Sequence, residues 1–148
     1  MSILYRIRSF GGSRQEIVQN VDSPVAISPD GKTVAFLSRN SSESLNKLSF
    51  ISIETGSLIN SFPIPFGIAS PDRVPVLRWT ADGKSVTYIV TRNDVSNIWQ
   101  QPLAGGEAKP LTDFSSERIF SFDWSKDDKQ IIYSRGVLRN NLVLIENF

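Results

Sequence analysis

Cysteine and histidine are both absent from this chain of 148 residues. The chain therefore cannot form a disulfide, a thiolate nucleophile, a Cys/His zinc site or an imidazole acid–base group. An excess of charge of one sign is also lacking, since 16 Lys and Arg balance 15 Asp and Glu. This balance predicts no nucleic-acid contact by this segment. No motif for a cofactor is present either, so none is expected.

Long hydrophobic runs are missing as well. No apolar stretch approaches the roughly 20 residues that a membrane-spanning helix needs, so no membrane span is predicted in this segment. The N-terminus reads MSILYRIR, where two arginines interrupt the apolar residues and no small-residue cleavage site follows. This pattern favours a strand over a signal peptide. A sustained helical period is also lacking, which argues against a helical solenoid.

One short phrase occurs three times along the chain. It reads SPDGK at 28–32, TADGK at 80–84 and SKDDK at 125–129. Each copy stands between two apolar runs, and Asp-Gly in that setting indicates a tight hairpin because glycine adopts the positive φ that the turn needs. Aspartate, which replaces glycine in the third copy, tolerates the same backbone region. The predicted turn residues are Asp30, Gly31, Asp82, Gly83, Asp127 and Asp128.

A second turn, marked by glycine, alternates with the first and divides the chain into four strand classes. Strand A precedes the phrase, strand B follows it, strand C precedes the second turn and strand D follows that turn. The predicted ranges are 24–28, 75–80 and 119–125 for A; 33–39, 85–92 and 130–135 for B; 3–9, 47–54, 97–103 and 142–146 for C; and 14–19, 58–63 and 108–112 for D. Four short strands per repeat of about 45–50 residues are typical of a β-propeller blade.

The strand pattern predicts an all-β partial β-propeller of about three four-stranded antiparallel blades, a fragment of a larger ring of six to eight blades. Trp79 and Trp124 directly precede the Ser or Thr of the phrase, and Ile27 takes that place in the first copy. Blades stack face to face and bury both faces of their strands, so these large side chains are expected to pack between neighbouring blades.

Both ends of the chain are incomplete in this scheme. We expect residues 1–22 to supply the last two strands of a preceding blade, 23–66 and 67–113 to form one blade each, and 114–148 to form a C-terminal blade of three strands. Three blades cannot close a ring, so the isolated chain is expected to self-associate or to need the rest of the propeller. A ring of two copies would leave strand 3–9 surplus beside strand 142–146. This mismatch favours a longer propeller, of which the chain is the C-terminal part.

The phrase and its surroundings resemble a known repeat. SPDGK before an apolar strand, together with IWQQPLAGGEAKPLT at 98–112, resembles the TolB-type β-propeller repeat. In the third copy, Lys126 and Asp128 stand where Pro and Gly are usual. The stretch from 111 to the end is similar to the C-terminal propeller of bacterial proteins that carry it after a serine/threonine kinase domain or a winged-helix DNA-binding domain. The resemblance implies a sensor or interaction domain on the extracytoplasmic side of a bacterial membrane.

Three functions are consistent with these features. The first is a non-catalytic sensor or interaction module of a bacterial signalling protein, binding a protein or small ligand of unknown identity. The second is the propeller of a prolyl-oligopeptidase-like serine peptidase, and the third is a free-standing TolB-type envelope scaffold. The segment carries no catalytic constellation of its own, so it is not expected to be an enzyme, although a full-length parent could carry a kinase domain.

Two side chains are candidates for ligand contact in the central channel. Arg78 and Asp123 occupy the same strand A position in neighbouring blades, with Ala26 as the third member. Strand A lines the channel of a propeller, so Arg78 and Asp123 are expected either to contact a ligand or to pair with each other.

Two further candidates lie on a long connection. Phe62 and Phe66 belong to a proline-stiffened stretch, 62–75, and such loops often carry binding residues. A packed structural loop is the alternative. Three arginines end the copies of strand B and are expected to brace the turn aspartates: Arg39, Arg92 and Arg135.

Overall fold

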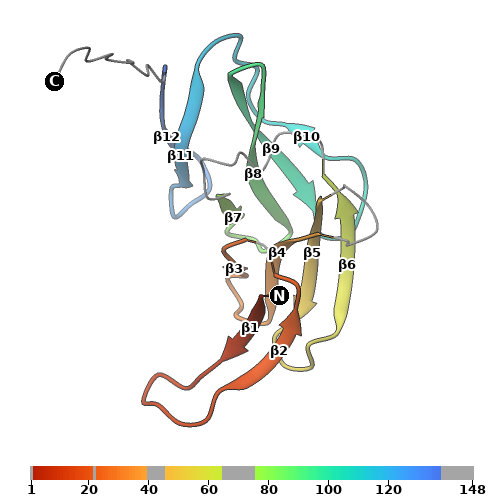
Figure 1. Ribbon diagram of the computed structural model, residues 1–148. Helices are drawn as coiled ribbons and strands as arrows, with labels where there is room; N and C mark the ends of the chain where they lie inside the picture. Colours follow the sequence, from red (N-terminus) through yellow and green to blue (C-terminus); the bar gives the residue numbers. More distant parts are fainter. Residues whose placement is uncertain (1, 22, 40–45, 65–75, 138–148) are drawn as a thin grey trace, which may run out of the picture.

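The computed structural model describes residues 2–21, 23–39, 46–64 and 76–137, and every regular element in these ranges is a β-strand (Figure 1). The first six strands are β1 (Ile3–Arg6), β2 (Gln15–Gln19), β3 (Ala26–Ile27), β4 (Thr33–Arg39), β5 (Asn46–Ser52) and β6 (Leu58–Pro63). The next six are β7 (Leu77–Trp79), β8 (Ser85–Arg92), β9 (Val95–Pro102), β10 (Lys109–Pro110), β11 (Arg118–Trp124) and β12 (Ile131–Gly136).

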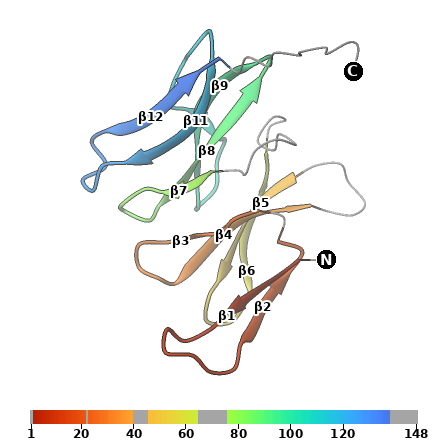
Figure 2. The same cartoon turned by 60° about the vertical axis from the view of Figure 1, so that its left-hand side comes forward.

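The strands form two complete sheets and two half-sheets, all antiparallel. The first full sheet has the order β3-β4-β5-β6 and the second full sheet the order β7-β8-β9-β10, so each is a simple meander. The N-terminal half-sheet is β1–β2 and the C-terminal half-sheet is β11–β12. Figure 2 shows the two half-sheets at opposite ends of the stack of sheets.

The predicted strands agree closely with the observed ones, with informative exceptions. β4 and β6 have the predicted bounds, whereas β9 begins two residues earlier than predicted. The reason is the turn before it: Asn93 and Asp94 have φ of 50° and 63°, and two consecutive positive φ values make the tightest type of hairpin. The predicted strand at 142–146 lies outside the described residues.

Both faces of the first full sheet are buried. Along β4, Val34 and Phe36 pack with residues of the N-terminal half-sheet, while Ala35 and Leu37 pack against the second full sheet. This alternation is the period of a strand whose two sides are both covered. At the outer end of this sheet, Gly56 lets the β5–β6 turn approach β2, because a Cβ at this position would lie 2.6 Å from the Ile17 carbonyl oxygen.

The main core lies between the two full sheets. Its centre is Phe50, whose ring meets that of Trp79 edge-on at 5.5 Å and that of Phe62 at 6.0 Å. A separate cluster of Ile98, Ile119 and Phe122 joins the second full sheet to the C-terminal half-sheet. Each sheet is therefore stabilised mainly by its neighbours.

The two tryptophans of the repeat make the same link between successive sheets. Trp79 Nε1 donates a hydrogen bond to the Ala26 carbonyl oxygen at 2.9 Å. Trp124 Nε1 donates to Thr87 Oγ1 at 3.0 Å, and that hydroxyl donates in turn to the Arg78 carbonyl oxygen at 3.1 Å. Ala26 on β3 and Arg78 on β7 hold equivalent places on the first strands of the two full sheets. The second link differs from the first only in that the Thr87 hydroxyl lies between the indole N–H and the backbone carbonyl oxygen. The predicted packing of both tryptophans between sheets is confirmed.

The repeated phrase owes its composition to one hydrogen-bond network. In the second copy, Thr80 Oγ1 donates to Asp82 Oδ1 at 2.7 Å, and the Lys84 amide donates to the same oxygen at 3.0 Å. The Ser85 amide donates to Thr80 Oγ1 at 3.1 Å, and the Gly83 amide closes the turn on the Thr80 carbonyl at 2.9 Å. The other two copies repeat every one of these bonds.

The same network lowers the pKa of each turn aspartate. For Asp82 the hydroxyl of Thr80 is the largest cause and the Lys84 amide the next, because both donate to the charged carboxylate. The pKa values of Asp30 and Asp127 are lowered in the same way, with a serine hydroxyl first. All six turn residues named from the sequence take part in this network.

In the third turn, Asp128 stands in place of glycine and makes an additional contact. Asp128 has a φ of 54°, so it adopts the backbone that glycine takes in the other two copies. Its carboxylate accepts a short hydrogen bond from the Ala81 amide of the preceding turn. The aspartate thus links two neighbouring turns, which a glycine in its place could not do.

Replacing Thr87 by Val tests the inserted hydroxyl. The side chain is 0% exposed, and Thr87→Val leaves the indole N–H of Trp124 and the Arg78 carbonyl without this partner. We expect a loss of about 1–3 kcal/mol in the free energy of unfolding by urea. Thr87→Ser keeps the hydroxyl and loses only a methyl group, so it should cost less, about 1 kcal/mol. The reverse order of the two variants would refute the link.

Replacing Asp82 by Asn tests the turn network by pH. The folded-state pKa is lowered from the ordinary 3.8, so the stabilisation is complete above that value and is lost as pH falls through the folded pKa. Asparagine keeps the accepting oxygen and does not titrate. The free energy of unfolding, measured by urea between about pH 5 and about pH 2, should fall less steeply in Asp82→Asn than in the unchanged chain. Parallel pH profiles would contradict this account.

Candidate functional site

The first strands of successive sheets, β3, β7 and β11, form what we call the inner edge of the stack, and the tryptophan links hold them in this order. This edge carries the two charged residues that the repeat predicted to lie at equivalent positions. Arg78 Nε on β7 lies 3.3 Å from Asp123 Oδ1 on β11. Arg78 Nη1 also donates to the Leu77 carbonyl at 3.0 Å, which directs the guanidinium along the strand edge. The equivalent positions of two neighbouring sheets therefore pair directly.

This pair is solvated, and its exposure decides what it can do. The side chains of Arg78 and Asp123 are 40% and 69% exposed. Exposed pairs of this kind stabilise a fold by less than about 1 kcal/mol. The pair therefore contributes little to folding, and both groups keep polar atoms available to solvent. A guanidinium binds carboxylates and phosphates, and a carboxylate binds ammonium or guanidinium groups.

Of the two candidate phenylalanines on the long connection, the structure describes only Phe62. Phe62 contributes to the main core through Phe50, and it also lines a hollow of about 480 Å³ together with Trp99 and Ile64. Phe66 lies outside the described residues. The packing alternative considered for this stretch thus holds for Phe62, whose ring belongs to the core while one side borders the hollow.

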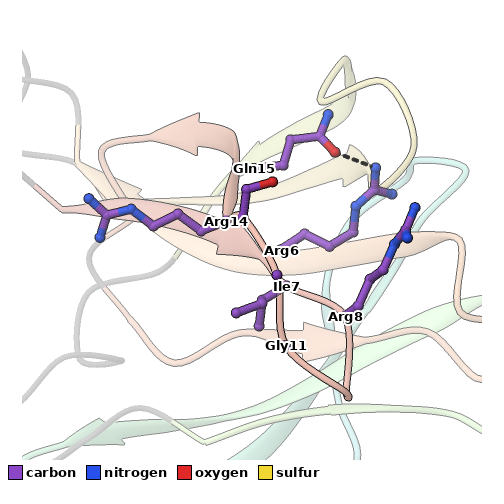
Figure 3. A pocket seen from close by; sticks show the side chains of 8 residues that line it. Arg6, Ile7, Arg8, Gly11, Arg14 and Gln15 are labelled. Atoms are coloured by element: carbon purple, nitrogen blue, oxygen red, sulfur yellow. Dashed lines mark hydrogen bonds between the residues drawn. The ribbon is translucent and has the colours of Figure 1, made fainter.

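A larger hollow, which the sequence did not predict, lies in the loop between β1 and β2. It has a volume of about 830 Å³, and three of its lining residues are arginines. Arg6 Nη2 donates to Gln15 Oε1 at 2.7 Å, and the guanidinium of Arg14 lies 4.7 Å from the ring centroid of Tyr5. Figure 3 shows that Arg14 extends away from Arg6 and Arg8. The three cations do not converge, so this loop offers no single anion site. In the sequence, the signal for this hollow was the presence of three arginines around a Gly-Gly turn.

The expectation that the strand B arginines brace the turn aspartates is wrong for Arg92 and Arg135. β8 begins just after the turn of Asp82 and ends at Arg92, so a whole strand, at about 3.3 Å per residue, separates the two. The guanidinium of Arg92 lies 5.9 Å from the ring centroid of Trp99. Arg135 Nε lies 2.8 Å from Glu117 Oε2. The side chain of Arg39 lies outside the described residues.

The described part of the chain contains little acid–base chemistry. Burial raises the pKa of the Tyr88 hydroxyl to about 12, so this phenol stays protonated at neutral pH. No group of three or more carboxylates in the described ranges gathers as a metal site would require. Over the same residues, no helix is long and apolar enough to cross a membrane.

Comparison with solved structures shows the fold. TolB from Acinetobacter baumannii is similar with a TM-score of 0.60 and 22% identity, over 82% of this chain and 29% of that chain. A structure from an analysis of two prolyl endopeptidases has a TM-score of 0.65 and 17% identity, over 90% of this chain and 22% of that chain. An uncharacterized protein from Listeria monocytogenes has a TM-score of 0.62 and 14% identity, over 82% of this chain and 35% of that chain.

These matches confirm the predicted all-β partial propeller and its resemblance to TolB-type propellers. The chain spans between 22% and 35% of the length of these three structures. No family model matches the chain, and no curated protein matches it. At these identities the likeness establishes the fold alone.

Proposed function

We propose that this chain is a non-catalytic interaction module that binds a charged protein segment or small ligand at the inner edge of its propeller. The observation that carries the proposal is the solvated Arg78–Asp123 pair on the innermost strands. Because this ion pair contributes little to the stability of the fold, each of its two groups can release the other and bind an opposite charge of a ligand. A segment with one cation and one anion, spaced to meet Asp123 and Arg78, fits this pair best.

We place this module in a bacterial signalling protein, after a kinase or winged-helix domain. The support is the resemblance of the C-terminal stretch to propellers in that position. With a kinase and a membrane anchor upstream, the propeller would lie on the extracytoplasmic side. The division into blades at residues 22, 66 and 113 belongs to the same proposal.

One observation favours a second candidate. The prolyl endopeptidase match has a TM-score of 0.65 and covers 90% of this chain, so a propeller attached to a peptidase is equally compatible with the fold. A free-standing scaffold is favoured in the same way by the likeness to TolB, at a TM-score of 0.60. All three candidates use the chain as a binding surface and differ in what is attached to it.

The coding sequence that adjoins this chain separates the candidates. We expect it to encode a kinase or winged-helix domain. An adjoining hydrolase domain with Ser, Asp and His in triad order would replace this proposal with the peptidase reading. A secretion signal followed directly by repeats would replace it with the scaffold reading.

Binding at the inner edge can be tested with a displayed library of random peptides. Peptides enriched on the immobilised chain should carry at least one acidic and one basic residue. Their affinity should fall about tenfold for each of Arg78→Ala and Asp123→Ala, because one charge-assisted hydrogen bond is lost. Lys109→Ala on β10, at the outer edge of the second full sheet, is the matched control and should leave the affinity unchanged. Equal binding to all four proteins would refute the inner-edge site.

A further inference from the structure

The two half-sheets are complementary parts of one blade. β11 and β12 are strands A and B of the repeat, and β1 and β2 are strands C and D. Within the described residues, β12 pairs only with β11 and β1 only with β2, so each presents one open edge. We propose that two copies of this chain join here, with β12 of one copy paired to β1 of the other. The order β11-β12-β1-β2 then makes a complete four-stranded sheet, and two copies close a six-bladed ring, within the usual range of about four to eight.

The second full sheet predicts the register of this joint. There Tyr88 on β8 stands opposite Trp99 on β9. On the β12 side, Trp124 is opposite Ile131 as Trp79 is opposite Val86, so Tyr133 holds the place of Tyr88.

The position of β1 follows from its own partner. Tyr5 is opposite Glu16 on β2 as Trp99 is opposite Pro110 on β10. Tyr5 and Trp99 also stand at the same distance before the glycine pair of the following turn. Tyr5 therefore holds the place of Trp99, and the joint puts Tyr5 of one copy opposite Tyr133 of the other.

The faces of the two half-sheets agree with this register. Leu4 packs toward the first full sheet, so the alternation of the strand turns Tyr5 to the other face, toward whatever sheet precedes. Tyr133 also faces the preceding sheet, since its ring lies 5.4 Å from that of Phe114. The two tyrosines are 38% and 40% exposed in the single chain. Directly opposite aromatic residues on one face form a favourable cross-strand pair.

A second pair of exposed side chains matches across the same joint. Ile27 holds the position of Trp79 and Trp124, and Ile132 holds the position of Ala35 and Thr87, over which those tryptophans lie. Ile27 is 59% exposed and Ile132 is 70% exposed.

Ile27 lacks the indole donor that Trp79 and Trp124 carry at this position, and Ile132, like Ala35, offers no hydroxyl. Two exposed apolar side chains at these positions can therefore pack against each other. This match favours a second copy over an unrelated partner as the occupant of the open edges. The predicted strand at 142–146 of the same chain would compete for the edge of β12, but it would leave Tyr5 and Ile27 uncovered.

Light scattering of the purified 148-residue chain gives the first test. We expect a discrete particle of twice the 16.5 kDa chain mass. Ile132→Lys places a charge in the joint and should halve the particle mass, whereas Ile59→Lys, at a 49% exposed site on β6, should leave it unchanged. A monomeric unchanged chain, or open-ended oligomers of no fixed size, would overturn the proposal.

Engineered cysteines test the register, because the chain has none of its own. Opposite residues of antiparallel strands have Cα atoms about 4.5–5.5 Å apart, within the range that a disulfide spans. Tyr5→Cys combined with Tyr133→Cys should give a covalent dimer on oxidation. Tyr5→Cys combined with Ile132→Cys is the matched control, since its cysteines lie on opposite faces, and its dimer yield should be several-fold lower. Equal yields, or a disulfide within a single chain, would show that β12 and β1 of two copies do not pair in this way.

Discussion

Every sheet of this protein depends on its neighbours, because each must bury both of its faces. In the first full sheet, β4 sends Val34 and Phe36 to one side and Ala35 and Leu37 to the other, and both sides are apolar. A four-stranded sheet covered on one side only would leave such side chains in water, at roughly 25 cal/mol for each Å² of apolar surface. Stability in this arrangement comes from the contact between successive units, as it does in other repeat proteins.

The polar contacts support the stacking of the sheets. The turn network of the repeated phrase is local and fixes where strand A ends and strand B begins, so the apolar residues on both strands keep their register. The indole hydrogen bonds of Trp79 and Trp124 then tie each inner strand to the one before it. Because these backbone and hydroxyl acceptors are satisfied between sheets, the innermost strands stay aligned, and Arg78 can reach Asp123. The candidate binding edge is thus a consequence of the stacking.

The ends of the chain show the same constraint from the other side. Tyr5, Ile27 and Ile132 occupy positions that are covered inside the stack, yet they are exposed where the stack stops. Their spacing matches the covered positions one for one. Closing a ring removes such surfaces and the open strand edges together, which is the physical reason that propellers are rings. The proposed pairing of two copies is one way to meet this requirement.

The sequence by itself determined the local structure. Strand positions followed from apolar runs between turn residues, and the turns at Asp30, Asp82 and Asp127 needed only residues close in the chain. The sequence left open whether Arg78 and Asp123 pair with each other or contact a ligand, and only the tertiary structure decided which polar groups meet. The Arg78–Asp123 pair, the hydrogen bond from the Ala81 amide to Asp128 and the partner of Arg135 each join segments from different turns or strands. The difference has one cause. Backbone turns are governed by neighbours along the chain, whereas a long side chain on an exposed edge takes the partner that the packing of whole sheets brings within reach.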